Sequence, residues 1–110
     1  MFSSELKKGS TEMLVLSLIE SRPRHGYEIG KLIEARSGGR LKFALPTLYP
    51  TLLRLENRGW IKGRWVERAG ERERCFYRLT PEGRRMLAEQ RRTWEAYVIA
   101  VNAVIEGGDA

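Results

Sequence analysis

The sequence predicts a mostly α-helical winged helix-turn-helix domain with a small β-hairpin wing, followed by a long C-terminal helix for dimerisation. Two observations support this fold. Residues 46–87 read as a helix, a hairpin and a second helix in direct succession. The chain is also basic, with 20 Lys and Arg against 14 Asp and Glu and a formal net charge of +6. A helix followed by a basic hairpin is typical of domains that lay the helix on DNA and the hairpin on its backbone.

Length and composition restrict the class of protein. One domain is expected from 110 residues, and a chain of this size buries only about two-thirds of its unfolded surface, so a dimer partner would add stability. The single Cys75 excludes an internal disulfide and fits a reducing cytosol. No stretch approaches the roughly 18 apolar residues of a membrane span. We therefore expect a cytoplasmic protein with no membrane partner. A basic balance favours polyanions but proves neither nucleic-acid nor membrane binding.

Two helices are expected in the first part of the chain. Apolar residues cover almost the whole circumference of residues 11–20, so that helix should be buried. Residues 26–36 place isoleucines and a leucine at helical spacing. Residues 41–43 are short and alternating, and they could pair as a small strand.

The third helix, residues 45–58, is the candidate recognition helix. Leucines follow one face at helical spacing, and Gly59 stands where a left-handed residue commonly ends a helix. The opposite face is expected to carry Thr47, Thr51, Arg54 and Arg58. Threonine suits base edges, and arginine suits guanine or phosphate. Taken alone, the same face could be an ordinary solvated surface.

Strands at residues 61–67 and 74–79, joined by a polar turn around Gly70, predict the wing. Four arginines of this hairpin could neutralise phosphates, namely Arg64, Arg68, Arg72 and Arg74. Three glutamates, Glu67, Glu71 and Glu73, leave the alternative that the charges pair with one another on a solvated wing. The tryptophans of the hairpin, Trp60 and Trp65, are expected to be packing residues.

The last helix is expected over residues 80–106, with Thr80 as its N-cap and Pro81 in its first position. It separates a DNA-binding domain, residues 1–79, from a flexible tail, residues 107–110. Its apolar strip predicts a homodimer interface by coiled-coil-like pairing. That strip consists of Leu87, Trp94, Val98, Val101 and Ile105. Packing against the first helix of the same chain is the alternative, and it is favoured for the end of the helix near Leu87.

The sequence does not favour an enzyme. One His, one Cys and no clustered carboxylates leave no catalytic triad, no acid–base pair and no set of metal ligands. We expect no catalytic residue, no metal and no cofactor. A winged-helix module that binds other proteins, without DNA affinity, is the alternative function, and the Arg/Glu alternation of the wing is its only support in the sequence.

Three segments carry a family resemblance: HGYEI at residues 25–29, TLYPTLLRLENRGWI at 47–61 and YRLTPEGRRML at 77–87. Together they resemble PadR-type transcriptional regulators over about residues 9–105. The resemblance implies a dimeric winged-helix regulator, usually a repressor, of the compact subgroup with a single C-terminal helix. It identifies the helix with the TLYP motif as the recognition helix.

The resemblance also implies residue roles. It places Thr47, Tyr49, Pro50, Thr51 and Arg54 on the recognition element, and Tyr27 and Lys31 on the preceding helix near the DNA backbone. With the wing arginines, the expected set for binding double-stranded DNA is Tyr27, Lys31, Thr47, Tyr49, Pro50, Thr51, Arg54, Arg68, Arg72 and Arg74. A two-fold dimer predicts an inverted-repeat operator.

Some members of this family respond to phenolic acids and others to flat, multidrug-type compounds. By resemblance, Trp94 would line a cavity at the dimer centre together with Tyr97 and Val98. A planar aromatic effector could stack there and release the protein from DNA. The alternative is that Trp94 is an ordinary interface aromatic, because such residues are enriched at interfaces.

Overall fold

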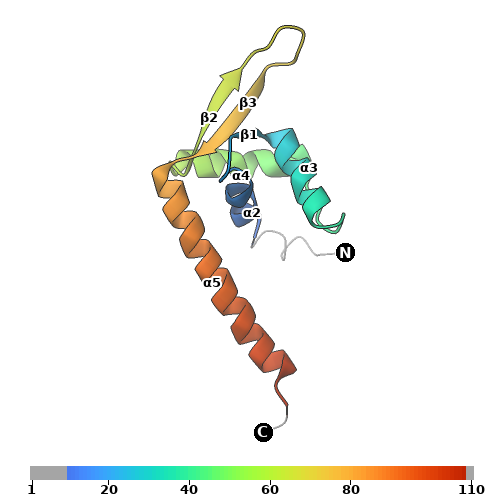
Figure 1. Ribbon diagram of the computed structural model, residues 1–110, viewed down its shortest axis with the longest axis vertical. Helices are drawn as coiled ribbons and strands as arrows, with labels where there is room; N and C mark the ends of the chain where they lie inside the picture. Colours follow the sequence, from blue (N-terminus) through green and yellow to red (C-terminus); the bar gives the residue numbers. More distant parts are fainter. Residues whose placement is uncertain (1–9, 109–110) are drawn as a thin grey trace.

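The computed structural model describes residues 10–108 and confirms the winged-helix prediction. Figure 1 shows an elongated molecule in which the hairpin and the free end of the last helix point to opposite ends. The elements are α2 (Thr11–Leu18), β1 (Arg24–His25), α3 (Gly26–Arg36), α4 (Leu45–Asn57), β2 (Ile61–Val66), β3 (Arg74–Leu79) and α5 (Pro81–Glu106). Residues 1–9 of the predicted DNA-binding domain and residues 109–110 of the predicted tail lie outside the described residues.

The sheet contains one strand that the sequence did not predict. Its order is β1-β3-β2, with both pairs antiparallel. Residues 41–43, the predicted small strand, form no strand. The edge of β3 pairs instead with β1, where His25 lies opposite Phe76. A two-residue strand is too short to show an alternating pattern, and for that reason the sequence did not reveal it.

The core lies where α2, α3, α4 and the first turns of α5 meet. Val15 and Leu16 of α2 are fully buried. On α4 the predicted leucine face is confirmed, because Leu48, Leu52 and Leu55 are all buried. The early end of α5 closes this core against α2. The α4 helix is therefore fixed on the body by one leucine face and keeps its other side for solvent.

Leu87 belongs to this core. This confirms the alternative favoured for this end of the helix, packing against the first helix of the same chain, and removes Leu87 from the predicted dimer-interface strip. Its exposed fraction is 0% within the single chain, so a partner could bury no further surface there. The reason is that the first turns of α5 pack against the apolar surface of α2 and bury it. Farther along α5, Val98 and Val101 are only half-buried, while Trp94 and Ile105 are exposed.

The end of α4, the root of the hairpin and the start of α5 meet at one tight contact. The Thr80 hydroxyl accepts a hydrogen bond from Gly83 N–H at 3.0 Å, which confirms the predicted N-cap. It also donates to the Gly59 carbonyl at 2.6 Å. Gly83 approaches the Trp60 carbonyl so closely that an added Cβ would lie 2.0 Å from its oxygen. Only glycine fits this crossing of α5 over the hairpin root.

Replacing Gly83 with alanine tests this contact. Helix propensity alone would favour alanine by about 1 kcal/mol, but the clash with backbone should destabilise the fold by about 1–3 kcal/mol or more. Urea unfolding should therefore show a lower midpoint for Gly83→Ala. Gly108→Ala is the control, because a Cβ at Gly108 meets nothing within 4 Å. A midpoint for Gly83→Ala equal to or above that of the unsubstituted protein would contradict the account.

Candidate nucleic-acid interface

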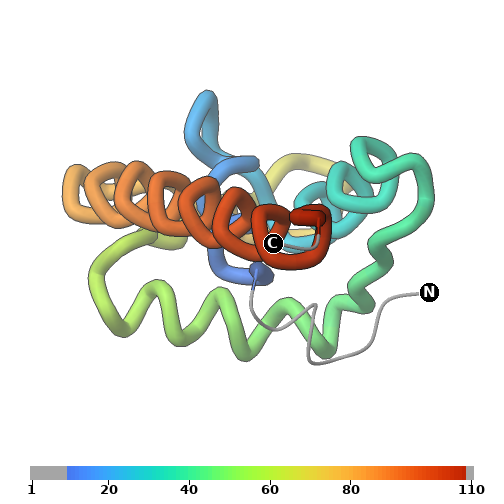
Figure 2. Tube along the Cα trace, turned by 90° about the horizontal axis from the view of Figure 1, so that it is seen from below, coloured from blue at the N-terminus to red at the C-terminus, as the bar shows by residue number. Residues whose placement is uncertain are grey.

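The open side of α4 carries polar, aromatic and proline side chains. In Figure 2, seen from the end of α5, α4 runs along one edge of the molecule. The helix continues through Pro50, whose ring lies on the exposed side. The exposed residues of this side include Pro46, Thr47, Tyr49, Pro50 and Leu53. Three predicted DNA-binding residues, Thr47, Tyr49 and Pro50, therefore share a solvent-facing surface.

Thr51 does not share that surface, and the prediction that placed it there is wrong. Its exposed fraction is 3%. Thr51 follows Leu48 by three residues and precedes Leu55 by four, so helical spacing puts it on the leucine face. Its Oγ1 accepts a hydrogen bond from Arg54 Nη2 at 3.2 Å. Thr51 therefore orients a neighbouring arginine and presents no group to a base edge.

Arg54 of α4 and Arg58, the C-cap residue that follows the helix, are exposed but already paired with a carboxylate. Arg58 Nη1 lies 2.9 Å from Glu12 Oε1, and Arg54 Nε lies 3.5 Å from Glu12 Oε2. About half of the Arg54 side chain remains accessible, with an exposed fraction of 51%. A guanidinium has five N–H donors, so each arginine keeps donors for a further acceptor. Sequence reasoning missed Glu12 because it lies more than 40 positions from its partners.

The arginines of the wing are not neutralised in this way. Within residues 10–108 no carboxylate lies within ion-pair distance of Arg64, Arg68, Arg72 or Arg74, which we call the wing arginines. The expected alternative, pairing of these residues with the wing glutamates, is absent from the described part of the chain. Lys62 and Arg78 stand directly opposite each other on β2 and β3, both exposed. Like charges in that position repel, so this sheet favours an anionic partner.

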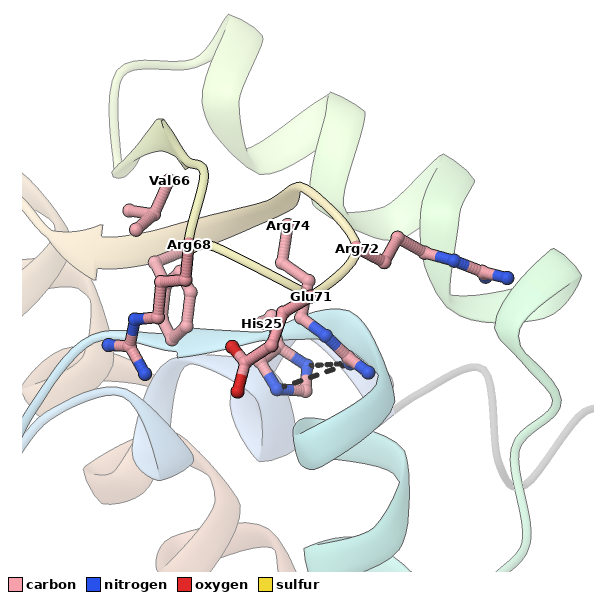
Figure 3. Close-up of a pocket in the computed structure, with 7 residues that line it drawn as sticks. His25, Val66, Arg68, Glu71, Arg72 and Arg74 are labelled. Carbon is pink, nitrogen blue, oxygen red and sulfur yellow. Dashed lines mark hydrogen bonds between the residues drawn. The ribbon is translucent and has the colours of Figure 1, made fainter.

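Three predicted DNA-binding residues, Arg74, Tyr27 and Lys31, lie together beside His25. Figure 3 shows Arg74 reaching the His25 ring, with Nη1 3.3 Å from Nδ1. Its guanidinium lies 5.9 Å from the centroid of the Tyr27 ring, and the Lys31 ammonium lies 5.5 Å from the same ring. Tyr27 is half exposed. The chain thus places a ring and two cations side by side, although they come from β3 and α3.

The surroundings of His25 favour the neutral form of its ring. Its Nδ1 accepts a hydrogen bond from Glu28 N–H at 3.2 Å and so caps α3. Partial burial lowers the pKa of His25 from its ordinary 6.5, because desolvation disfavours the charged ring. The positive charge of Arg74 lowers it further. A neutral ring is also the form that can accept the capping hydrogen bond.

A groove of about 630 Å³ runs between the wing and the first turns of α3 and α4. Its lining includes Tyr27, Tyr49, Trp65, Arg72 and Arg74. Trp60 packs against the core as predicted, but Trp65 is 66% exposed, so its prediction as a packing residue is wrong. Aromatic rings and guanidinium groups in one groove can stack on bases and bind phosphates. Trp65 joins the candidate interface as a residue that the sequence analysis missed.

The described residues offer neither a metal site nor a membrane-spanning helix. Residues 10–108 contain no group of three or more His, Cys, Asp or Glu side chains placed to hold a metal ion. In the same range none of the helices combines the length and the apolar character needed to cross a membrane.

The His25 cap predicts a pH dependence of stability. Because the folded pKa lies below 6.5, the unfolded chain takes up the proton first as the pH falls. The free energy of unfolding should therefore decrease below about pH 6.5, until the folded-state pKa is reached. His25→Asn keeps a capping acceptor without this titration. Thermal unfolding from about pH 7.5 to about pH 5.5 should show a smaller loss for His25→Asn, and parallel profiles would rule the assignment out.

Comparisons with known proteins agree with this geometry. The family model described as "Transcriptional regulator PadR-like family" matches residues 15–89. A solved transcriptional regulator from Clostridium thermocellum is 32% identical, with a TM-score of 0.84, covering 93% of this chain and 96% of that one. A PadR family transcriptional regulator from Eggerthella lenta is 33% identical, with a TM-score of 0.83, covering 94% of this chain and 88% of that one.

A PadR-like transcriptional regulator from Bacillus cereus is 25% identical, with a TM-score of 0.81, and the match covers 96% of this chain and 100% of that one. The matched family segment spans the core helices, the wing and the start of α5. This chain therefore belongs to the PadR-like family of transcriptional regulators, which bind DNA through a winged helix.

Proposed function

We propose that this regulator is a dimeric repressor that binds an inverted-repeat operator with α4 and the wing. The observation that carries the proposal is that the wing arginines have no ion-pair partner among residues 10–108, and that two of them, Arg72 and Arg74, border a groove that α4 shares through Tyr49. In this arrangement α4 enters the major groove with Thr47, Tyr49 and Pro50 towards the bases. A repressor of this kind acts on the chromosome, which implies a cytoplasmic location.

The remaining predicted residues take supporting roles in this proposal. Tyr27 and Lys31, beside Arg74, contact the DNA backbone next to α4. Arg68 and Arg72 reach the flanking phosphates from the tip of the wing, where both are exposed. Arg54, at the edge of α4, uses the donors that Glu12 leaves available. The protein-binding alternative is weaker, because no described ion pair joins the wing charges to one another.

The far half of α5 supports the dimer. It extends away from the body in Figure 1 and exposes apolar side chains that a single chain leaves uncovered. Trp94 and Ile105 are exposed, and Val98 and Val101 are half-buried. Pairing with the same helix of a second protomer would bury this strip. The distance between the two recognition helices would then be set by α5.

We also propose that a planar aromatic effector binds near the dimer axis. The Trp94 and Tyr97 rings have centroids 6.4 Å apart and are inclined by 39°, with half-buried Val98 next along the helix. A flat ligand can stack on such rings. It releases the operator only if it binds the DNA-free arrangement of the two protomers more tightly than the DNA-bound one.

DNA selection from a random pool tests the operator proposal. The selected sequence should be an inverted repeat whose half-sites are separated by one helical turn or a multiple of it. Affinity should fall steeply between about 50 mM and about 200 mM salt, because the wing arginines displace counterions. Fluorescence anisotropy measures both. A selected site without two-fold symmetry, bound equally well at both salt concentrations, would refute the proposal.

A charge in the α5 strip tests the dimer. Val101→Asp would bury an unpartnered carboxylate between the two helices, so it should split the dimer and abolish operator binding together. Ile99→Asp is the matched control, because Ile99 lies about 200° around the helix from Val101 and so faces away from the strip. Sedimentation velocity at micromolar concentration gives the oligomeric state. An unsubstituted protein that is a monomer, or a dimeric Val101→Asp variant, would rule the interface out.

A further inference from the structure

The sheet of the wing has an outer face that points away from the core and from α4. Successive side chains of a strand point to opposite faces. The register partners Ile61 and Leu79 are buried in the core, which defines the inner face. On that face a Cβ at Gly63 would lie 3.2 Å from Oε2 of Glu56, a residue of α4. The alternating residues make up the outer face, namely Lys62, Arg64, Phe76 and Arg78.

The outer face carries cations that have no carboxylate partner. Lys62 lies directly opposite Arg78, Arg64 lies opposite Phe76, and all three cations are exposed. Among residues 10–108 no Asp or Glu lies within ion-pair distance of these cations. Like charges in opposite positions repel, so an anionic partner would stabilise this face. Lys62 and Arg78 are not wing arginines, and the DNA-binding proposal uses neither of them.

Phe76 forms the apolar centre of the outer face. A hollow of about 260 Å³ lies beside its ring, and Pro23 and Val66 supply further apolar surface there. The His25 ring meets the Phe76 ring edge-on, with centroids 5.2 Å apart, and the Arg68 guanidinium lies 5.9 Å from the Phe76 centroid. The ring is therefore held in position within the single chain.

The size and lining of the hollow indicate what it can bind. It is smaller than the roughly 300–1,000 Å³ that is common for small-molecule sites, but it suits one anchoring side chain of a larger partner. The rest of its lining is arginine, and no Asp or Glu lines it. A DNA duplex offers phosphates and sugars to such a surface, which would leave the hollow without an apolar group. An acidic peptide offers both carboxylates and an apolar anchor.

We propose that the outer face of the wing docks an acidic peptide segment of another protein. One apolar side chain of the peptide occupies the hollow beside Phe76, and flanking carboxylates pair with Lys62, Arg64 and Arg78. The open side of α4 and the tip of the wing stay available for DNA, so one chain can hold an operator and a protein partner together. Docking on this face does not depend on the proposed DNA-binding function.

The first experiment measures docking on the full-length protein saturated with a selected operator, so that the DNA-binding surface is already occupied. Fluorescence anisotropy of the labelled peptide EDEEFEDE should show binding without release of the operator. The peptide EDEEAEDE should bind about tenfold more weakly, because it lacks the anchoring ring, and the uncharged QNQQFQNQ should also bind more weakly. Equal affinities for EDEEFEDE and EDEEAEDE, no binding by EDEEFEDE, or release of the operator by it would each overturn the proposal.

The second experiment separates the outer face from the DNA-binding surface. The double variant Lys62→Gln/Arg78→Gln removes two exposed cations, so the Kd of EDEEFEDE should rise about fivefold to tenfold, while operator affinity and its salt slope stay unchanged. Arg72→Ala is the matched control, because it should lower the salt slope and leave peptide binding unchanged.

Two results of this comparison would overturn the proposal. An unchanged peptide Kd in the double variant would show that Lys62 and Arg78 do not hold the peptide. A lower operator salt slope in the double variant would show that the outer face binds DNA instead. If the protein selects no DNA, the proposed function fails, while the same peptide titrations on the free protein and on the double variant still decide docking.

Discussion

The close approach of Gly83 to the Trp60 carbonyl is the constraint on which the arrangement of the molecule depends. It joins the end of α4, the root of the wing and the start of α5 at one point, and Thr80 secures the same point with two hydrogen bonds. The orientation of the wing is thereby tied to the direction of the helix that extends away from the body. In a dimer built on α5, the spacing of the two DNA-binding surfaces would follow from this contact.

Charge is distributed unequally over the candidate interface. Arg54 of α4 and its C-cap Arg58 share one carboxylate, Glu12, which comes from α2, a helix distant in the sequence. On the wing, within the described residues, the arginines have no such partner. The two groups would therefore behave differently towards DNA. Oriented guanidinium groups favour discrimination between sites, because their directions are fixed, whereas unpaired cations on a hairpin favour phosphates of any sequence.

Local patterns predicted most of the fold, because helical spacing and capping residues act over a few positions. The bounds of α3 and β3 and the Thr80 cap were predicted from such patterns, and the structure confirms them. The predictions failed where a contact between residues far apart in the sequence determines the local structure. β1 was not predicted, because it forms only where β3 offers an open edge for pairing. Thr51 was a local error, since its spacing from the leucines already placed it on the buried face. Glu12 could not be found from spacing at all.

The proposed role of the wing arginines, which have no ion-pair partner among residues 10–108, is to hold DNA phosphates, and the salt dependence of operator binding measures this role. The logarithm of the binding constant should fall linearly with the logarithm of salt concentration, and Arg72→Ala should reduce that slope by about 0.9 for each protomer bound. Arg85→Ala, which removes a cation paired with Glu82 on α5, should leave the slope unchanged. A slope for Arg72→Ala identical to that of the unsubstituted protein would contradict the claim.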